Sequence, residues 1–205
     1  METVVIKRED LISRNSDNKF LQQVIRKIEK DYWDDGKVLF DVHLDGILID
    51  ESSPFNNLDI QSNDYSEIKL RVQLLDDLVW STVDSTLEYV KKLSTFCEST
   101  VDKYRKEKYE AALRDLVQIV DSAQWTFESV TLINTQLTKK CPTAYQSQFA
   151  LWMNTELKFV NVLKELIESF DSSDYILQAD ILEFDFLTIL DESLVYLESI
   201  KNTRV

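Results

Sequence analysis

The chain of 205 residues carries 37 acidic and 23 basic side chains, and its net charge of −14 disfavours nucleic acids and anionic membranes as partners. Its 44% hydrophobic and 11% aromatic residues are enough for a buried core, which excludes a disordered acidic segment. The sequence contains two glycines and two prolines, which favours long helices and leaves little material for Gly-rich phosphate-binding loops.

The first 73 residues predict a β-α-β-β-β unit. The β-branched segment 2–7 is strand-like, and a helix is expected after a cap at Ser16 or Asp17, ending at Gly36. The apolar face of this helix would consist of Phe20, Val24, Ile25 and Ile28.

A β-hairpin is the clearest signal in this unit. Apolar and polar residues alternate over 38–44, Asp45-Gly46 follows, and a second apolar run begins at Ile47. An Asp-Gly pair at this place fits a type I′ turn, in which both central residues have positive φ. The polar segment 51–65 reads as a loop, and 68–72 alternates as a further strand.

Residues 74–205 predict an antiparallel four-helix bundle, with helices at about 74–104, 108–139, 143–170 and 175–201. The breaks are expected at Cys141-Pro142 and at 171–174, where a turn and a new cap coincide. Residues 105–108 contain no helix breaker, so 74–139 could instead form one long helix. We expect a break there.

The apolar spacing of three and four residues assigns an inward face to each helix. The expected faces are Val83, Leu87, Val90, Cys97, Val101 and Tyr104; then Tyr109, Leu113, Leu116, Val120, Ala123, Phe127, Val130 and Leu137; then Tyr145, Phe149, Trp152, Val160, Leu163, Ile167 and Phe170; and finally Leu177, Ile181, Phe184, Leu187, Leu190, Leu194 and Leu197.

Carboxylate pairs are the strongest enzymatic lead in the sequence. Glu165-x-x-Glu168 and Asp180-x-x-Glu183 flank one turn, an arrangement that resembles the ExxE…ExxD magnesium motif of the all-α nucleoside triphosphate pyrophosphatases. The resemblance implies a metal-dependent nucleotide hydrolase. It covers only these residues, and the second pair has the reverse order. Both pairs lie beside or opposite the apolar faces, where exposed charge is normal.

The other candidate catalytic or metal-binding side chains lack the sequence motifs that such sites require. His43 is the single histidine and lies in an expected strand, and no Glu-x-x-His pair exists for a di-iron site. Cys97 and Cys141 lack C-x-x-C spacing. The basic cluster of Lys103, Arg105, Lys106 and Lys108 reads as a solvated helix junction.

The sequence therefore predicts an α+β, mainly α fold, with a small unit at 1–73 and an acidic, coiled-coil-like bundle at 74–205. No catalytic, cofactor-binding or metal-binding residue is assigned. The charged N-terminus and the absence of a long apolar run indicate a cytoplasmic protein without a membrane partner. We expect a non-catalytic interaction module with a protein partner, and a basic partner is compatible with residues 142–205, which hold 11 acidic against 4 basic residues. The nucleotide hydrolase and a self-associating structural bundle are the alternatives.

Overall fold

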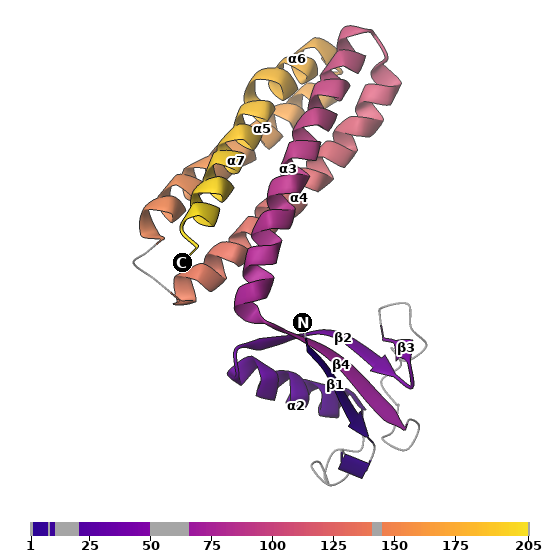
Figure 1. Cartoon of the computed structure of the whole chain (residues 1–205). Coiled ribbons are helices and arrows are strands. Elements are labelled where there is room, and N and C mark those ends of the chain that lie inside the picture. The colour runs from indigo at the N-terminus through magenta and orange to yellow at the C-terminus, as the bar shows by residue number, and fades with distance from the viewer. Residues whose placement is uncertain (1, 8, 11–20, 50–65, 141–144, 205) are drawn as a thin grey trace. The chain divides into compact units, whose positions relative to one another are not determined.

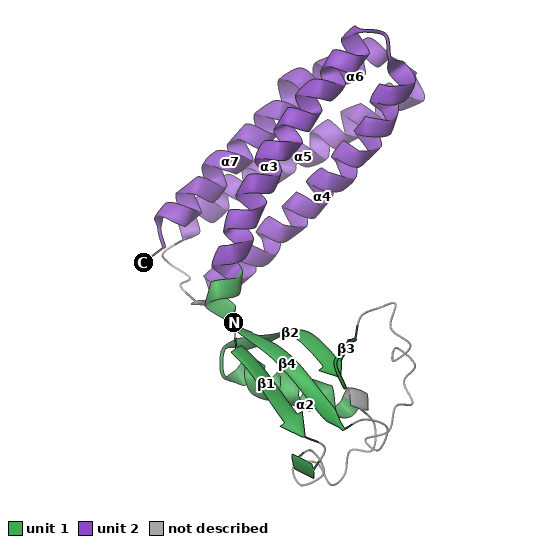
Figure 2. Ribbon diagram, turned by 45° about the vertical axis from the view of Figure 1, so that its right-hand side comes forward, with its two compact units in different colours: residues 1–78 green, residues 79–205 purple. Residues whose placement is uncertain are grey.

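The computed structural model describes residues 2–7, 9–10, 21–49, 66–140 and 145–204. The fold is α+β and mainly α, as predicted, with a four-stranded antiparallel sheet followed by long helices (Figure 1). The chain divides into two compact units, residues 1–78 and 79–205 (Figure 2). The predicted cap at Ser16 or Asp17, the position of Phe20, the loop at 51–65 and the break at Cys141-Pro142 lie outside the described residues.

The described residues of unit 1 form a sheet that the helix α2 (Leu21–Asp34) packs against. The strands are β1 (Glu2–Lys7), β2 (Lys37–Leu44), β3 (Ile47–Leu48) and β4 (Glu67–Leu74), in the spatial order β1-β4-β2-β3. Neighbouring strands pair antiparallel throughout. The helix α2 lies between β1 and β2 in the chain.

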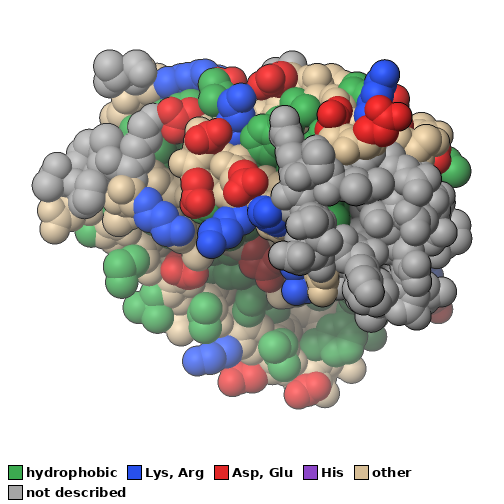
Figure 3. Space-filling model, turned by 90° about the horizontal axis from the view of Figure 1, so that it is seen from below, with side chains coloured by type: hydrophobic (Ala, Val, Ile, Leu, Met, Phe, Trp, Pro, Cys, Tyr) green, Lys and Arg blue, Asp and Glu red, His purple; other side chains and the backbone are tan. Residues whose placement is uncertain are grey.

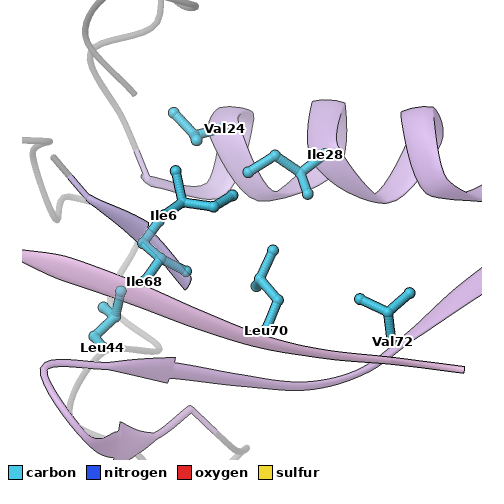
Figure 4. Packing of buried hydrophobic residues seen from close by; sticks show 7 residues of the cluster. All are labelled: Ile6, Val24, Ile28, Leu44, Ile68, Leu70 and Val72. Atoms are coloured by element: carbon cyan, nitrogen blue, oxygen red, sulfur yellow. The ribbon is translucent and has the colours of Figure 1, made fainter. Parts of the chain in front are cut away.

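The core of unit 1 follows from the two-residue period of β4. Ile68, Leu70 and Val72 are fully buried on one face of this strand, where Val24 and Ile28 of α2 point toward them (Figure 4). The intervening residues of β4 are polar or charged, so one face of the sheet forms the core.

Two local turns in unit 1 agree with the sequence prediction. Asp45 and Gly46 have φ angles of 46° and 86°, as a type I′ turn requires, and Leu44 pairs with Ile47 across it. Gly36 has a φ of 70° and follows the end of α2 at Asp34, so it terminates the helix as expected.

A β-bulge interrupts the alternation of β2. Leu39 pairs with Val72 and Asp41 pairs with Arg71, so Phe40 is an extra residue without a partner in β4. The bulge places both Leu39 and Val42 against the core, and the side chain of Phe40 is exposed.

The described residues of unit 2 form four helical rods that alternate in direction (Figure 1). They are α3 (Leu75–Arg105), α4 (Tyr109–Lys140), α5 (Gln146–Asp171) and a composite rod of α6 (Tyr175–Asp180), the π-helix η2 (Ile181–Phe186) and α7 (Leu187–Asn202). No helix among the described residues is long and apolar enough to cross a membrane.

The turn between α3 and α4 answers the question of one helix or two. Glu107 adopts a left-handed conformation, with a φ of 57°. Its N–H donates to the carbonyl of Tyr104, and the N–H of Lys108 donates to that of Lys103, which is the Schellman pattern of a helix end. Residues 74–139 therefore form two helices.

The turn between α5 and α6 has the same geometry. Ser173 has a φ of 56°, and the N–H groups of Ser173 and Asp174 donate to Phe170 and Ser169. The carboxylate of Asp174 then accepts a hydrogen bond of 3.0 Å from the N–H of Leu177. The predicted turn and cap at 171–174 are confirmed.

The predicted inward faces hold for the first two helices. All six residues expected inside α3 are buried. In α4, Tyr109, Leu113 and Val120 are half-buried and the other five expected residues are buried.

The predicted face of α5 was partly wrong. Tyr145 and Trp152 are buried, but Val160, Ile167 and Phe170 are exposed. The buried positions are Trp152, Thr155, Phe159, Val162, Leu166 and Ser169. Because this buried stripe contains the small polar residues Thr155 and Ser169, the large apolar residues beside it gave the stronger signal in the sequence.

The predicted face of the last rod was also partly wrong. Ile181, Leu190 and Leu197 are buried and Leu187 and Leu194 are half-buried, but Leu177 and Phe184 are exposed. The cause is η2, since a π-helix contains more residues per turn than the 3.6 assumed in the prediction.

A glycine at position 107 should stabilise unit 2. Glu107→Gly removes the cost of holding a side chain at positive φ, and we expect the free energy of unfolding to rise by about 0.5–1 kcal/mol in urea denaturation. The matched control Glu110→Gly, inside the first turn of α4, should lower it by about 1 kcal/mol. A loss of stability in Glu107→Gly would contradict the assigned helix end.

Candidate functional site

The four carboxylates singled out in the sequence do not form one cluster. Glu165 and Glu168 are exposed on α5, whereas Asp180 and Glu183 lie at the junction of α6 and η2. Among the described residues, no group of three or more acidic, histidine or cysteine side chains is placed to hold a metal ion. The resemblance to the pyrophosphatase motif therefore has no counterpart in the geometry of these residues.

The guanidinium of Arg105 bridges the two carboxylates of the second pair, Asp180 and Glu183. Its Nη2 atom lies 2.6 Å from Asp180 Oδ1 and 2.8 Å from Glu183 Oε2. Hydrogen bonds to Glu183 and Asp180 raise the pKa of the Arg105 guanidinium. A cation that bridges both carboxylates takes the place that a metal ion would need, so this pair acts as a link between helices.

A buried polar network adjoins this ion pair. The hydroxyl of Tyr104 donates to Gln178 Oε1 at 2.8 Å, and Gln178 Nε2 donates to the carbonyl of Ser169 at 3.1 Å. Desolvation is the main cause that raises the pKa of Tyr104. Nearby, the rings of Tyr109 and Tyr175 stack at 4.3 Å. These contacts join the α3–α4 turn to the α5–α6 turn, which makes a structural role the natural one.

His43 and Cys97 are the remaining reactive side chains that the structure describes. His43 is half-buried in β2, where it pairs with Leu48 and Lys69. Cys97 is buried, desolvation raises the pKa of its thiol to about 12, and its Sγ lies 3.8 Å from the carbonyl oxygen of Leu182. A thiol with such a pKa is almost wholly protonated at neutral pH and is a poor nucleophile.

Three of the four residues in the basic cluster form ion pairs. Lys103 pairs with Asp115, Lys106 pairs with Asp102 at 3.0 Å, and Arg105 bridges the two carboxylates already described. On the face of the molecule in Figure 3, basic and acidic side chains also lie next to one another. Neither arrangement forms a basic patch for an anionic partner.

In the described part of the chain, a groove between α4 and α5 is a candidate binding site. It has a volume of about 500 Å³. Its lining includes Thr131, Asn134, Thr135 and Thr138 from α4 and Phe149, Trp152, Met153 and Glu156 from α5. Asn134 is held by the hydroxyl of Tyr196, which donates to its Oδ1 at 2.5 Å. The groove therefore has an aromatic floor and a polar wall.

An apolar stripe on the outside of α5 continues from this groove. Met153, Leu157, Val160 and Ile167 are spaced by four, three and seven residues, and their side chains are 69%, 61%, 43% and 62% exposed. This spacing places all four on one side of the helix. We call these four residues the outer stripe. The sequence showed two of them, Val160 and Ile167, but assigned them to the core.

A protein-family comparison supports treating the helical unit as a module. The model of the domain of unknown function DUF8042 matches residues 81–194, from the first turns of α3 to the middle of α7. No curated protein and no solved structure matches the sequence.

Removal of the bridging cation should expose the repulsion between the two carboxylates. We expect Arg105→Gln to lower the melting temperature, by a margin that shrinks in high salt because salt screens the repulsion. Millimolar magnesium should leave the melting temperature of the wild type unchanged. A clear rise with magnesium in the wild type would instead support the metal-dependent hydrolase.

Loss of the Tyr104 hydroxyl should leave a buried acceptor without a partner. We expect Tyr104→Phe to lower the free energy of unfolding by about 1–3 kcal/mol, because Gln178 is fully buried. Tyr175→Phe keeps the stacked ring and serves as the matched control in the same urea titration. Equal stability of the two variants would show that the Tyr104–Gln178 bond does not hold the helices together.

Proposed function

Since the chain belongs to the DUF8042 family, whose description assigns no function, we propose from its own geometry that it is a non-catalytic protein-interaction module of the cytoplasm. The proposed binding surface is the outer stripe of α5 together with the α4–α5 groove. Partner binding of this kind places an apolar helix face in an apolar groove.

The outer stripe carries the proposal. The buried stripe of α5, which includes Trp152, Phe159 and Leu166, already packs against the rest of unit 2. The outer stripe is therefore not needed to bury the helix, and it keeps four large apolar side chains on the surface. Contiguous exposed apolar surface is typical of interaction sites.

The groove adds directionality to this surface. Met153 belongs both to the outer stripe and to the lining of the groove, so the two form one continuous surface. Asn134 and Glu156 in the lining offer polar groups at one end, and Leu157, Val160 and Ile167 extend the apolar part along α5. A partner segment would thus meet polar contacts at one end and apolar contacts along its length.

The size of the apolar surface indicates a binding site of moderate strength. Complete burial of one large aliphatic side chain contributes roughly 1.5–3 kcal/mol, and the outer stripe offers four such side chains that are partly exposed. Association itself costs at least about 4 kcal/mol. The groove and the surrounding charges must therefore contribute before the affinity becomes useful.

Substitution of the outer stripe should abolish partner capture. With the full chain immobilised in native extract, we expect Leu157→Gln with Ile167→Gln to lower recovery of a stoichiometric partner about tenfold or more. Glutamine preserves helix propensity, and both residues are exposed, so the melting temperature should stay close to that of the wild type.

The matched control removes two equally exposed apolar residues from other helices. Ile176→Gln with Val195→Gln alters α6 and α7 and should leave capture unchanged. Equal recovery by both double variants, or no stoichiometric partner with the wild type, would contradict the proposed binding surface.

A further inference from the structure

We infer that the segment bound along the outer stripe is a cationic amphipathic helix of a partner protein. This inference rests on the proposed function and adds the charge, the length and the secondary structure of the occupant.

The first observation is the uneven charge of unit 2. Residues 79–141 contain nine acidic and nine basic side chains, so this part is neutral. Residues 142–205 contain 11 acidic and 4 basic side chains, a surplus of seven negative charges. Most of this surplus lies on the last rod, with six acidic and one basic residue, and α5, which carries the outer stripe, holds four acidic and two basic residues.

The second observation is the position of the carboxylates around the outer stripe. At 3.6 residues per turn, Glu156 lies about 60° to one side of the stripe and Glu168 about 60° to the other, with Glu165 further round. Glu156 also lines the groove, and Glu165 and Glu168 are exposed. Carboxylates thus flank the apolar side chains on both sides.

Few cations oppose these carboxylates on the same surface. Lys158 is paired with Glu192 of α7, on the other side of α5. Lys139 lines the end of the groove, and the exposed Lys164 is one cation within the outer stripe, one turn from both Val160 and Ile167. An apolar stripe between acidic flanks is complementary to a helix with an apolar stripe between basic flanks.

The length of the occupant follows from the helix geometry. Met153 and Ile167 are 14 residues apart, which corresponds to about 21 Å along α5. A partner helix of about 14–18 residues would match this stripe. Its apolar residues should recur every three or four positions, as they do in the outer stripe.

Charge also decides between this occupant and a second copy of the chain. Two copies that met through α5 would bring two surfaces with a negative surplus together, and close like charges oppose association. A cationic helix meets the opposite sign. We therefore favour a different protein over self-association.

Three synthetic peptides of about 18 residues test the inference with the full chain. The first has leucine at every third and fourth position and lysine elsewhere, the second has glutamate in place of lysine, and the third has the composition of the first in an order without an apolar face. Fluorescence anisotropy of the labelled peptides measures their affinities.

We expect the first peptide to bind at least tenfold more tightly than either of the others. Its affinity should decrease when the NaCl concentration is raised from about 0.05 M to about 0.5 M, because salt screens the ion pairs. Glu165→Gln with Glu168→Gln should weaken it roughly three- to tenfold. The matched control, Glu88→Gln with Glu98→Gln on α3, removes the same charge elsewhere and should have no effect.

The outcomes separate this inference from the proposed function. Equal binding of the lysine and glutamate peptides, lost in both cases with Leu157→Gln and Ile167→Gln, would overturn the cationic occupant and leave the interaction surface in place. Peptide binding that is unchanged by those two substitutions would show that the outer stripe is not the binding surface. A dimer in sedimentation that the same substitutions abolish would make a second copy the occupant. If no peptide binds, the inferred occupant is wrong.

Discussion

The hydrogen bond between the Tyr104 hydroxyl and the buried amide of Gln178 fixes how the two helical hairpins of unit 2 align. Apolar side chains of similar size tolerate small shifts of one helix along another, whereas a buried hydrogen bond tolerates very little. The Arg105 bridge to Asp180 and Glu183 and the stacked rings of Tyr109 and Tyr175 act at the same end. This end is therefore a fixed point from which the positions of α5 and its two apolar stripes follow.

Local signals in the sequence predicted the elements well. The Asp45-Gly46 hairpin, the stop at Gly36 and the turn at 171–174 each depend on a few adjacent residues. Features that depend on distant residues could not be predicted in this way. The bulge at Phe40 requires the register with β4, and the bridge to Asp180 depends on Arg105, which is 75 residues away in the chain. The two stripes of α5 were merged because periodicity alone does not tell which one is buried.

The net charge of the chain bears on partner binding only when the positions of the charged residues in the fold are known. A net charge of −14 is compatible with solubility alone. In the structure, however, the charge surplus of unit 2 lies on the last rod and, to a smaller extent, on α5, the helix that has apolar residues left on its surface. The carboxylates that resemble a metal motif divide between two roles, since Asp180 and Glu183 link helices and Glu165 and Glu168 face solvent.

The π-helix η2 determines where unit 2 can absorb a change in chain length. Buried residues recur at every fourth position through Gln178, Leu182, Phe186 and Leu190, and the Leu187 N–H donates to the carbonyl of Leu182, five residues earlier. One residue fewer here would rotate α6 by about 100° relative to α7. Gln178 would then turn away from Tyr104 while the packing of α7 stayed in place. The wide turn of η2 thus lets Gln178 in α6 face Tyr104 while the apolar residues of α7 face the core.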